Sequence, residues 1–252
     1  MIKFDEKYIP LPNREMNVQT LDYLLRSRKT ILSILSSRGY NTKPYEKFGY
    51  EEIEIMASGA SGGTRALRMD LERPPESTDT GITKCRVEYC IGKMKQKVDK
   101  LVSEMLPADD LGTEESKVEA KSSLEDDTVN PKTTEVMVIL IDDTHPMADI
   151  FHARSLELWN KRQFRIAFFL IDNLVNNPAE HVLVPKHERV PTKDHKEILK
   201  RYYTDRKAQL PWIVFHIDIQ ARILGLVPGD IVKITRGSPS AGYYTEYRVC
   251  AP

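Results

Sequence analysis

The chain has 252 residues, and its 37 Lys and Arg residues balance 37 Asp and Glu residues, so the formal net charge at pH 7 is zero. This balance gives no global electrostatic reason for strong independent binding to nucleic acid. The longest apolar runs, such as residues 136–141, are far too short to cross a bilayer, so we expect no membrane partner. The length allows one large domain or two modest domains.

The chain has three cysteines, Cys85, Cys90 and Cys250, and this number does not suggest a disulfide scaffold. Cys85 and Cys90 have no second pair of ligands nearby, which argues against a zinc site. The first residues also lack the shape of a signal peptide. We therefore expect reduced thiols and an intracellular protein.

Residues 18–38 predict a helix with a broad apolar stripe, and Gly39 ends it. Arg28 falls near the centre of the stripe. A packing arginine that snorkels or pairs with a carboxylate explains this position better than direct contact with DNA. Arg26 and Lys29 are basic residues on the solvent face. The simpler interpretation of either one is that it solvates the helix.

Residues 82–91 alternate as a half-buried strand would. This pattern places Cys85 on the inward face and both Arg86 and Glu88 on the outward face. Residues 94–106 then predict an amphipathic helix. The two segments indicate a strand followed by a helix in the first half of the chain.

Residues 108–134 differ from the rest of the chain. Residues 109–127 contain eight acidic residues and two lysines, which give a net charge of −6, and they contain no aromatic residue. Such a segment cannot bury enough apolar surface to offset its ordering entropy, so we interpret it as a disordered insertion. An acidic partner-binding segment is the alternative. The glycine-rich residues 58–64 lack the Gly-Lys-Ser/Thr ending of a phosphate-binding loop, and we expect a flexible loop or hairpin there.

Residues 136–141 and 164–171 are continuous apolar runs, separated by the amphipathic residues 147–159. This pattern is typical of a βαβ unit in a sheet that is covered on both faces. Residues 173–179 then form a linker to a C-terminal domain.

Two helices are predicted in the last quarter of the chain. Thr192 is placed as the N-cap of a helix over residues 193–203, because its hydroxyl can accept an orphan helix N–H. Asp218 is placed as the N-cap of a second helix, and Gly225 as the residue that ends it.

A β-hairpin is predicted after these helices. Pro228-Gly229 fits a type II turn, and residues 231–236 and 243–249 alternate as two strands. Helices and hairpin together predict a small two-layer α/β domain.

The same part of the chain carries an ordered set of short motifs. They are Leu183-Val184-Pro185-Lys186-His187, Leu199-Lys200-Arg201-Tyr202, Gln209-Leu210-Pro211, Leu224-Gly225-Leu226, Gly229-Asp230-Ile231-Val232-Lys233-Ile234-Thr235-Arg236, Ala241-Gly242-Tyr243 and Tyr247-Arg248. Order and spacing resemble the assembly domain of the small fifth subunit shared by eukaryotic nuclear RNA polymerases I, II and III, which has a shorter counterpart in the archaeal RNA polymerase. The run 212–217 departs from this family, which is more polar there.

The first predicted helix carries a second likeness. Residues 25–30, followed by Arg38-Gly39-Tyr40, are similar to the first helix of the eukaryotic form, in a domain that the archaeal counterpart lacks. The resemblance therefore implies an α/β protein of the long form. Its N-terminal three-layer, nuclease-like jaw domain would span residues 1–178, and its small two-layer α/β assembly domain residues 179–252. It also implies a nuclear location, or a viral factory or virion if a large DNA virus encodes the chain.

The resemblance implies a non-catalytic subunit of a multisubunit DNA-directed RNA polymerase, with the largest subunit and other polymerase subunits as partners. The residues that it implies at the subunit interface are Lys200, Arg201, Tyr202, Leu210, Pro211, Gly242, Tyr247 and Arg248. The jaw domain would lie near the downstream duplex DNA, with His145 and Pro146 at its tip and Arg26 and Lys29 as further DNA-proximal residues.

A nuclease is the enzyme that such a jaw domain would most resemble. Its chemistry needs clustered carboxylates and a nearby lysine, usually as Glu-x-Lys on a strand. Here Cys90 stands where that lysine would follow Glu88, and nothing completes a set around Asp142-Asp143. We therefore expect no catalytic residue, metal, cofactor or small-molecule substrate. A free-standing nuclease-fold DNA-binding protein is the alternative.

Overall fold

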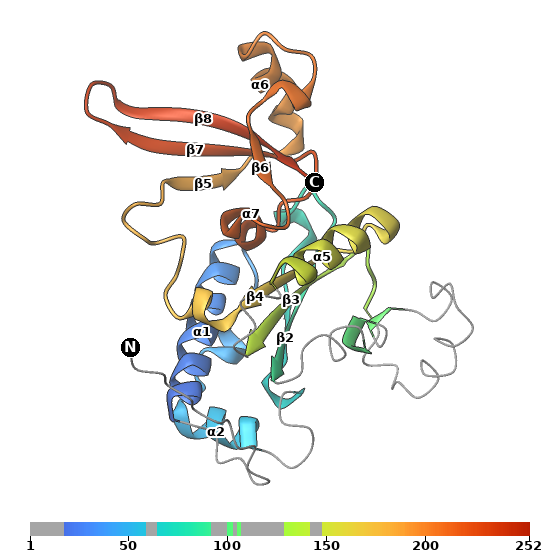
Figure 1. The fold of residues 1–252 in the computed structure, drawn as a ribbon, viewed down its shortest axis with the longest axis vertical. Coiled ribbons are helices and arrows are strands. Elements are labelled where there is room, and N and C mark those ends of the chain that lie inside the picture. The colour runs from blue at the N-terminus through green and yellow to red at the C-terminus, as the bar shows by residue number, and fades with distance from the viewer. Residues whose placement is uncertain (1–17, 59–64, 92–99, 103–104, 107–128, 142–147) are drawn as a thin grey trace, which may run out of the picture.

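The computed structural model describes residues 18–58, 65–91, 100–102, 105–106, 129–141 and 148–252, and these residues build two four-stranded sheets (Figure 1). The first sheet has the order β1-β2-β3-β4, and the second has the order β5-β7-β8-β6. The fold is mixed α/β, as the sequence predicted.

The first sheet joins three parallel strands to one antiparallel edge strand, β1. Its strands are β1 (Met69–Glu72), β2 (Lys84–Ile91), β3 (Thr134–Ile141) and β4 (Ile166–Leu170). The helix α5 (Ala148–Arg162) connects β3 to β4, which confirms the predicted βαβ unit.

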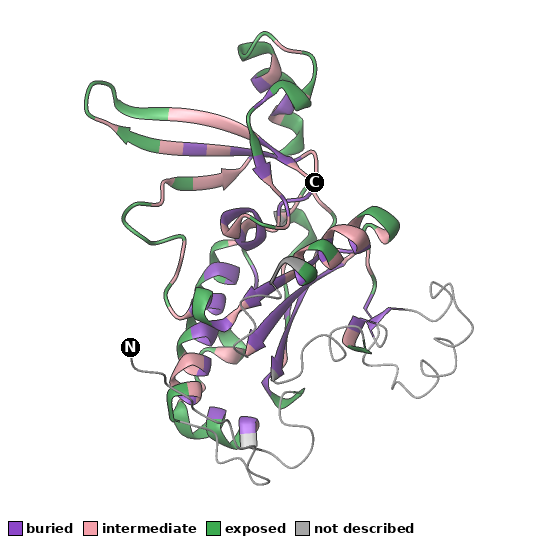
Figure 2. Cartoon of the chain, in the orientation of Figure 1, coloured by how far each residue is buried: buried purple, intermediate pink, exposed green. Residues whose placement is uncertain are grey.

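Helices cover both faces of this sheet (Figures 1 and 2). The helix α1 (Val18–Ser37) and the short α2 (Tyr50–Ser58) pack on one face, in a core that includes Phe169. The helix α5 packs on the other face, where Phe151 lies 5.6 Å from Phe168 between ring centroids. This part of the chain therefore has three layers. The short 3-10 turns around it are Lys43–Tyr45, Arg65–Leu67, Pro75–Ser77 and Ile171–Leu174.

The predicted outward face of β2 is wrong, because Arg86 and Glu88 are only 8% and 6% exposed. Nε of Arg86 lies 2.7 Å from Oδ1 of Asp70, and Nε of Arg68 lies 2.9 Å from Oε1 of Glu88. Alternation identifies an outward face only where that face meets water. Here ion pairs within the sheet let the charged positions lie buried.

Two predicted boundaries are also wrong. Val129 is buried, its amide donates to the Met105 carbonyl at 2.9 Å, and Thr134 already begins β3, so the predicted insertion 108–134 does not extend over its last residues. Leu174 is fully buried in the core beneath α1, so the linker starts after it.

Several sequence predictions fall outside the described residues. They are the glycine-rich loop 59–64, most of the predicted helix 94–106, the acidic segment 109–127 and the tip at His145 and Pro146.

The second sheet is built around the predicted hairpin, which is confirmed. Its strands are β5 (Lys186–Arg189), β6 (Trp212–Val214), β7 (Ile231–Ser238) and β8 (Gly242–Ala251). β8 lies between two partners, since it pairs antiparallel with β7 and parallel with β6. The turn before β7 has Gly229 at φ 94°, and the Asp230 amide donates to the Val227 carbonyl at 2.9 Å, as a type II turn requires.

The helix α7 (Ile219–Leu224) begins and ends as predicted. Oδ1 of Asp218 accepts the amide of Gln220 at 2.7 Å, and Gly225 ends the helix at φ 63°. The other predicted cap, Thr192, is wrong. Residues Thr192–Asp194 form a 3-10 turn, α6 spans only His195–Arg201, and no side chain caps it. A further 3-10 turn spans Lys207–Gln209.

Candidate functional site

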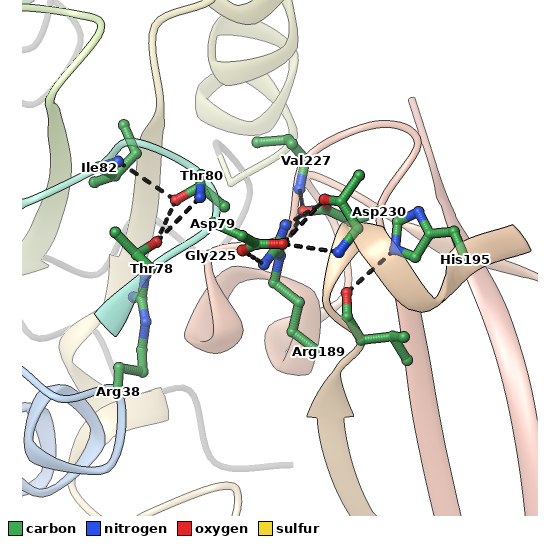
Figure 3. Close-up of polar contacts among 12 residues, drawn as sticks. Arg38, Thr78, Asp79, Thr80, Ile82, Arg189, His195, Gly225, Val227 and Asp230 are labelled. Atoms are coloured by element: carbon green, nitrogen blue, oxygen red, sulfur yellow. Dashed lines mark hydrogen bonds and ion pairs between the residues drawn. The ribbon is translucent and has the colours of Figure 1, made fainter. Parts of the chain in front are cut away.

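One guanidinium joins carboxylates from the two sheets (Figure 3). Nη1 of Arg189, on β5, is bonded to Oδ1 of Asp79, in the loop that leads to β2. Nη2 of Arg189 lies 3.0 Å from Oδ1 of Asp230. Oδ2 of Asp79 also accepts the amide of Thr192 at 2.8 Å and its hydroxyl at 3.0 Å. The Thr192 side chain therefore serves this junction and not a helix cap.

These contacts set the charge states at the junction. Burial alone would raise the pKa of Asp79, but the Thr192 amide and the Arg189 guanidinium hold it well below its usual range. Burial alone would lower the pKa of Arg189, and the hydrogen bonds that it donates to the carboxylates of Asp230 and Asp79 raise it instead. Both groups are therefore fully charged at neutral pH.

A second ion pair lies against the end of α7. Nη2 of Arg38 is 2.6 Å from Oε1 of Glu135, which also accepts the Tyr40 hydroxyl at 2.6 Å. Nη1 of Arg38 donates to the Ile223 carbonyl at 3.3 Å. A β-carbon at Gly225 would lie 2.9 Å from Oε2 of Glu135. The ion pair therefore comes closer to the backbone at position 225 than any residue other than glycine would allow.

A third arginine crosses the junction in the opposite direction. Arg222, on α7, is 9% exposed and donates to the carbonyl oxygens of Phe168 in β4 and Ile217. Its guanidinium carbon lies 5.1 Å from the centre of the Phe169 ring. Burial lowers the pKa of Arg222 to about 10, which still leaves it charged at neutral pH. Three arginines thus hold the two sheets in one arrangement.

Part of the predicted interface gathers on the second sheet beside a hollow of about 620 Å³. Arg201 and Tyr247 line this hollow, and the ring of Tyr202 meets that of Tyr247 edge-on, with 6.0 Å between centroids. Lys200 lies exposed on the same helix. We call Arg201, Tyr202 and Tyr247 the aromatic-arginine surface.

The other predicted interface residues lie elsewhere. Pro211 is exposed, Gly242 begins β8 at the far end of the hairpin, and Nε of Arg248 lies 2.8 Å from Oε1 of Glu246. Leu210 does not belong with the exposed residues of the predicted interface. It is 3% exposed and packs in a core with Val249, so its side chain faces no surface.

The predicted DNA-proximal residues are described only on α1. Nη2 of Arg26 donates to Oδ1 of Asn176 at 2.9 Å, and its Nη1 lies 3.6 Å from Oδ2 of Asp22. Lys29 is exposed. His145 and Pro146 lie outside the described residues, so the structure does not place them relative to Arg26 and Lys29.

The sequence interpretation missed two features. Tyr243 and Tyr244 are 78% and 55% exposed, because the hairpin extends beyond the layers that would cover it (Figure 2), and Trp212 on β6 is 64% exposed. The alternation of the hairpin strands was the available signal, since it puts the two tyrosines on opposite faces. The pairing of Asp79 with Arg189 had no signal, because the residues are 110 positions apart.

The described residues hold no group of three or more His, Cys, Asp or Glu side chains placed to bind a metal, and no helix among them is long and apolar enough to cross a membrane. Glu88, the carboxylate weighed for a nuclease, is paired with Arg68, and the three cysteines are free and buried.

Comparison with known proteins identifies the second sheet. Residues 176–250 match the family described as RNA polymerase Rpb5, C-terminal domain. The subunit Rpo5 of DNA-directed RNA polymerase from Thermococcus kodakarensis is 44% identical over 73 residues, which is 29% of this chain and 87% of that protein. The chain belongs to the Rpb5 family of RNA polymerase subunits.

Other Rpb5-family relatives agree. Rpo5 from Methanocaldococcus jannaschii is 44% identical over 71 residues, which is 28% of this chain and 88% of that subunit. Rpo5 from Nitrosopumilus maritimus is 42% identical over 69 residues, which is 27% of this chain and 81% of that subunit. As a family member, this chain is a subunit of a DNA-directed RNA polymerase, and its partners are other subunits of that enzyme. The relatives give no support for a viral origin.

Proposed function

We propose that this chain is a non-catalytic polymerase subunit that docks on the largest subunit through residues 179–252. The observation that carries this proposal is the extent of the likeness. Relatives named as polymerase subunits share little more than the second sheet, since the match covers 87% of one such subunit but only 29% of this chain. The shared part is therefore the best candidate for the part that assembles.

The aromatic-arginine surface is the proposed centre of the contact. Tyrosine and arginine are the side chains that most often dominate binding energy at protein interfaces. Arg201 is exposed and Tyr202 is 38% exposed, so both are available to a partner. Lys200, Pro211, Gly242, Tyr247 and Arg248 complete the proposed interface.

Co-purification of full-length variants with the largest subunit tests the proposal. We expect Arg201→Ala or Tyr202→Ala to weaken binding by about 1–3 kcal/mol each, a typical cost for truncating a central interface residue. Lys161→Ala is the control, because Lys161 is 68% exposed on α5 and is not one of the proposed interface residues. If neither interface variant changes binding to the largest subunit, the assignment of this surface is wrong.

We further propose that residues 1–178 form part of the lower jaw beside the downstream duplex, in a nuclear polymerase. Nucleotidyl transfer would occur in the two large subunits. Of the proposed contacts, Lys29 is exposed, whereas Arg26 already has Asn176 and Asp22 as partners. His145 and Pro146 are proposed from the resemblance alone. Crosslinking from residue 145 in the assembled enzyme should reach DNA, and crosslinks to protein only would contradict the jaw proposal.

A further inference from the structure

A hollow of about 420 Å³ lies at the junction of the two sheets, and its lining is unbalanced in charge. Five arginine or lysine side chains and three carboxylates line it, an excess of two positive charges with His187 neutral. The lining comes from α1, the loop before β2, and strands of both sheets, so a bound ligand would touch both halves of the protein (Figure 3).

The three carboxylates already have cationic partners. Glu135 pairs with Arg38, Asp79 with Arg189, and Glu188 with Lys186. The excess charge therefore belongs to the two remaining lining arginines, Arg73 and Arg165.

Both of these arginines bond only to uncharged groups. Arg73 donates to the carbonyls of Ile82 and Arg38 and to Oγ1 of Thr78. Nη1 of Arg165 lies 3.4 Å from the Gly225 carbonyl, and its guanidinium stacks 5.6 Å from the Trp159 ring centre. Within the described part of the chain, neither guanidinium forms an ion pair with a carboxylate.

Arg165 is partly buried among other charged groups. Burial is the main cause that lowers its pKa; Asp230 and Glu135 favour its charged form, and Arg189 and Arg38 oppose it less strongly. Guanidinium nevertheless stays protonated in proteins. Carbonyl oxygens supply hydrogen bonds but no countercharge, so an anion would be the favoured occupant beside it.

We propose that this hollow binds a small oxyanion of the phosphate class, either free or carried by a nucleotide, through Arg165 and Arg73. The planar guanidinium matches two phosphate oxygens at once, which gives direction as well as attraction. A site lined by both sheets also couples binding to the junction, because a ligand that binds only this arrangement stabilises it. This inference is independent of how the subunit docks in the polymerase.

Thermal unfolding of the full chain in sodium pyrophosphate, against sodium chloride of equal ionic strength, tests the proposal. We expect pyrophosphate at about five times its Kd to raise Tm by about 2–4 °C, because a fivefold excess over Kd stabilises the folded state by roughly 1 kcal/mol and a chain of this length shifts by about that many degrees for each kcal/mol. ATP and adenosine distinguish the sources. A shift with ATP but not adenosine shows that a nucleotide phosphate also binds, and a shift with pyrophosphate alone indicates the free anion. Equal shifts in pyrophosphate and chloride would overturn the proposal.

Variants locate the site. Arg165→Gln should raise the apparent Kd for pyrophosphate about tenfold, the loss expected for one charge-assisted contact. Lys186→Gln should raise it about twofold to threefold, and because Lys186 is 72% exposed this variant folds even if Arg165→Gln does not. Lys161→Gln on α5 should leave the Kd unchanged. The assignment would be overturned if Lys186→Gln binds pyrophosphate with the wild-type Kd and Arg165→Gln either fails to fold or also binds with the wild-type Kd.

Discussion

Nη2 of Arg38 lies 2.6 Å from Oε1 of Glu135, and this buried ion pair fills the space beside Gly225. Gly225 also has φ 63°, a conformation that costs other residues about 1–2 kcal/mol. We expect Gly225→Ala to lower the free energy of unfolding by about 3 kcal/mol, since strain and displacement of the ion pair add. Urea denaturation measures this change.

Gly39→Ala is the matched control for this prediction. Gly39 has φ 85° at the end of α1, but a β-carbon there would meet nothing within 4 Å. This variant should show the backbone strain alone, about 1–2 kcal/mol. Equal losses in the two variants would mean that the close approach of Arg38 and Glu135 is unimportant.

The ionic junction predicts a specific dependence on pH. Asp79→Asn should lower the free energy of unfolding at pH 7 by about 1 kcal/mol, a small loss because the Asp79 side chain is 34% exposed. The folded-state pKa of Asp79 lies below its ordinary value of 3.8, so its contribution is complete above that value and is lost as pH falls through the folded-state pKa. The difference from wild type should stay constant from pH 7 to about 5 and shrink below about 4.

Glu72→Gln is the control for the ionic junction. Glu72 is 69% exposed and pairs with Lys84, which is 57% exposed, so this substitution should change stability little. A gap between wild type and Asp79→Asn that widens in acid would contradict the role given to Asp79.

His195 predicts a second loss of stability in acid, which arises from the burial of a neutral imidazole and not from an ion pair. It is 4% exposed, its Nε2 lies 3.1 Å from the Val190 carbonyl, and burial and the nearby Lys207 lower its pKa below 6.5. Because the unfolded state binds the proton more readily, stability falls as pH drops from about 6.5 through the lower folded-state pKa.

The change His195→Gln should remove this loss while its amide still reaches the Val190 carbonyl. Chemical denaturation between pH 7.5 and pH 5 should therefore show a smaller decline for His195→Gln than for wild type. His181→Gln, at an exposed imidazole, should decline as wild type does. Parallel curves for all three proteins would refute the prediction.

The buried Arg222 should matter for stability and not for assembly. Arg222→Met leaves the carbonyls of Phe168 and Ile217 without this donor, and we expect a loss of about 2–3 kcal/mol in the free energy of unfolding. Arg201→Met, at an exposed position on α6, should change stability by less than about 0.5 kcal/mol. Comparable losses in the two variants would contradict the contrast.

Local signals in the sequence predicted the local structure. The apolar runs of β3 and β4, the Asp218 cap and the Gly225 end of α7 follow from residues within a few positions of each other. Thr192 shows the limit of such rules, because its hydroxyl donates a hydrogen bond to the distant carboxylate of Asp79 and does not cap the helix. Arg86 and Glu88 show a second limit, since their partners, Asp70 on β1 and Arg68 just before it, allow charged residues to be buried.

The sequence predicted one of the two proposed binding surfaces and not the other. Tyr202 and Tyr247 were predicted through an ordered motif set, and the structure places their rings in contact. The charge excess at Arg73 and Arg165 was not predicted, because it depends on which carboxylates the fold has already paired with other cations. No spacing along the chain encodes that pairing.

The position of β8 fixes an order of events during synthesis. β8 follows β7 and β6 in the chain, yet it lies between them and supplies hydrogen bonds to both. The first sheet is complete at Leu170, so it can form while the ribosome is still translating the rest of the chain. The second sheet cannot close until Ala251 has left the exit tunnel. A nascent subunit would therefore complete the second sheet, which carries the proposed docking surface, only once β8 has emerged.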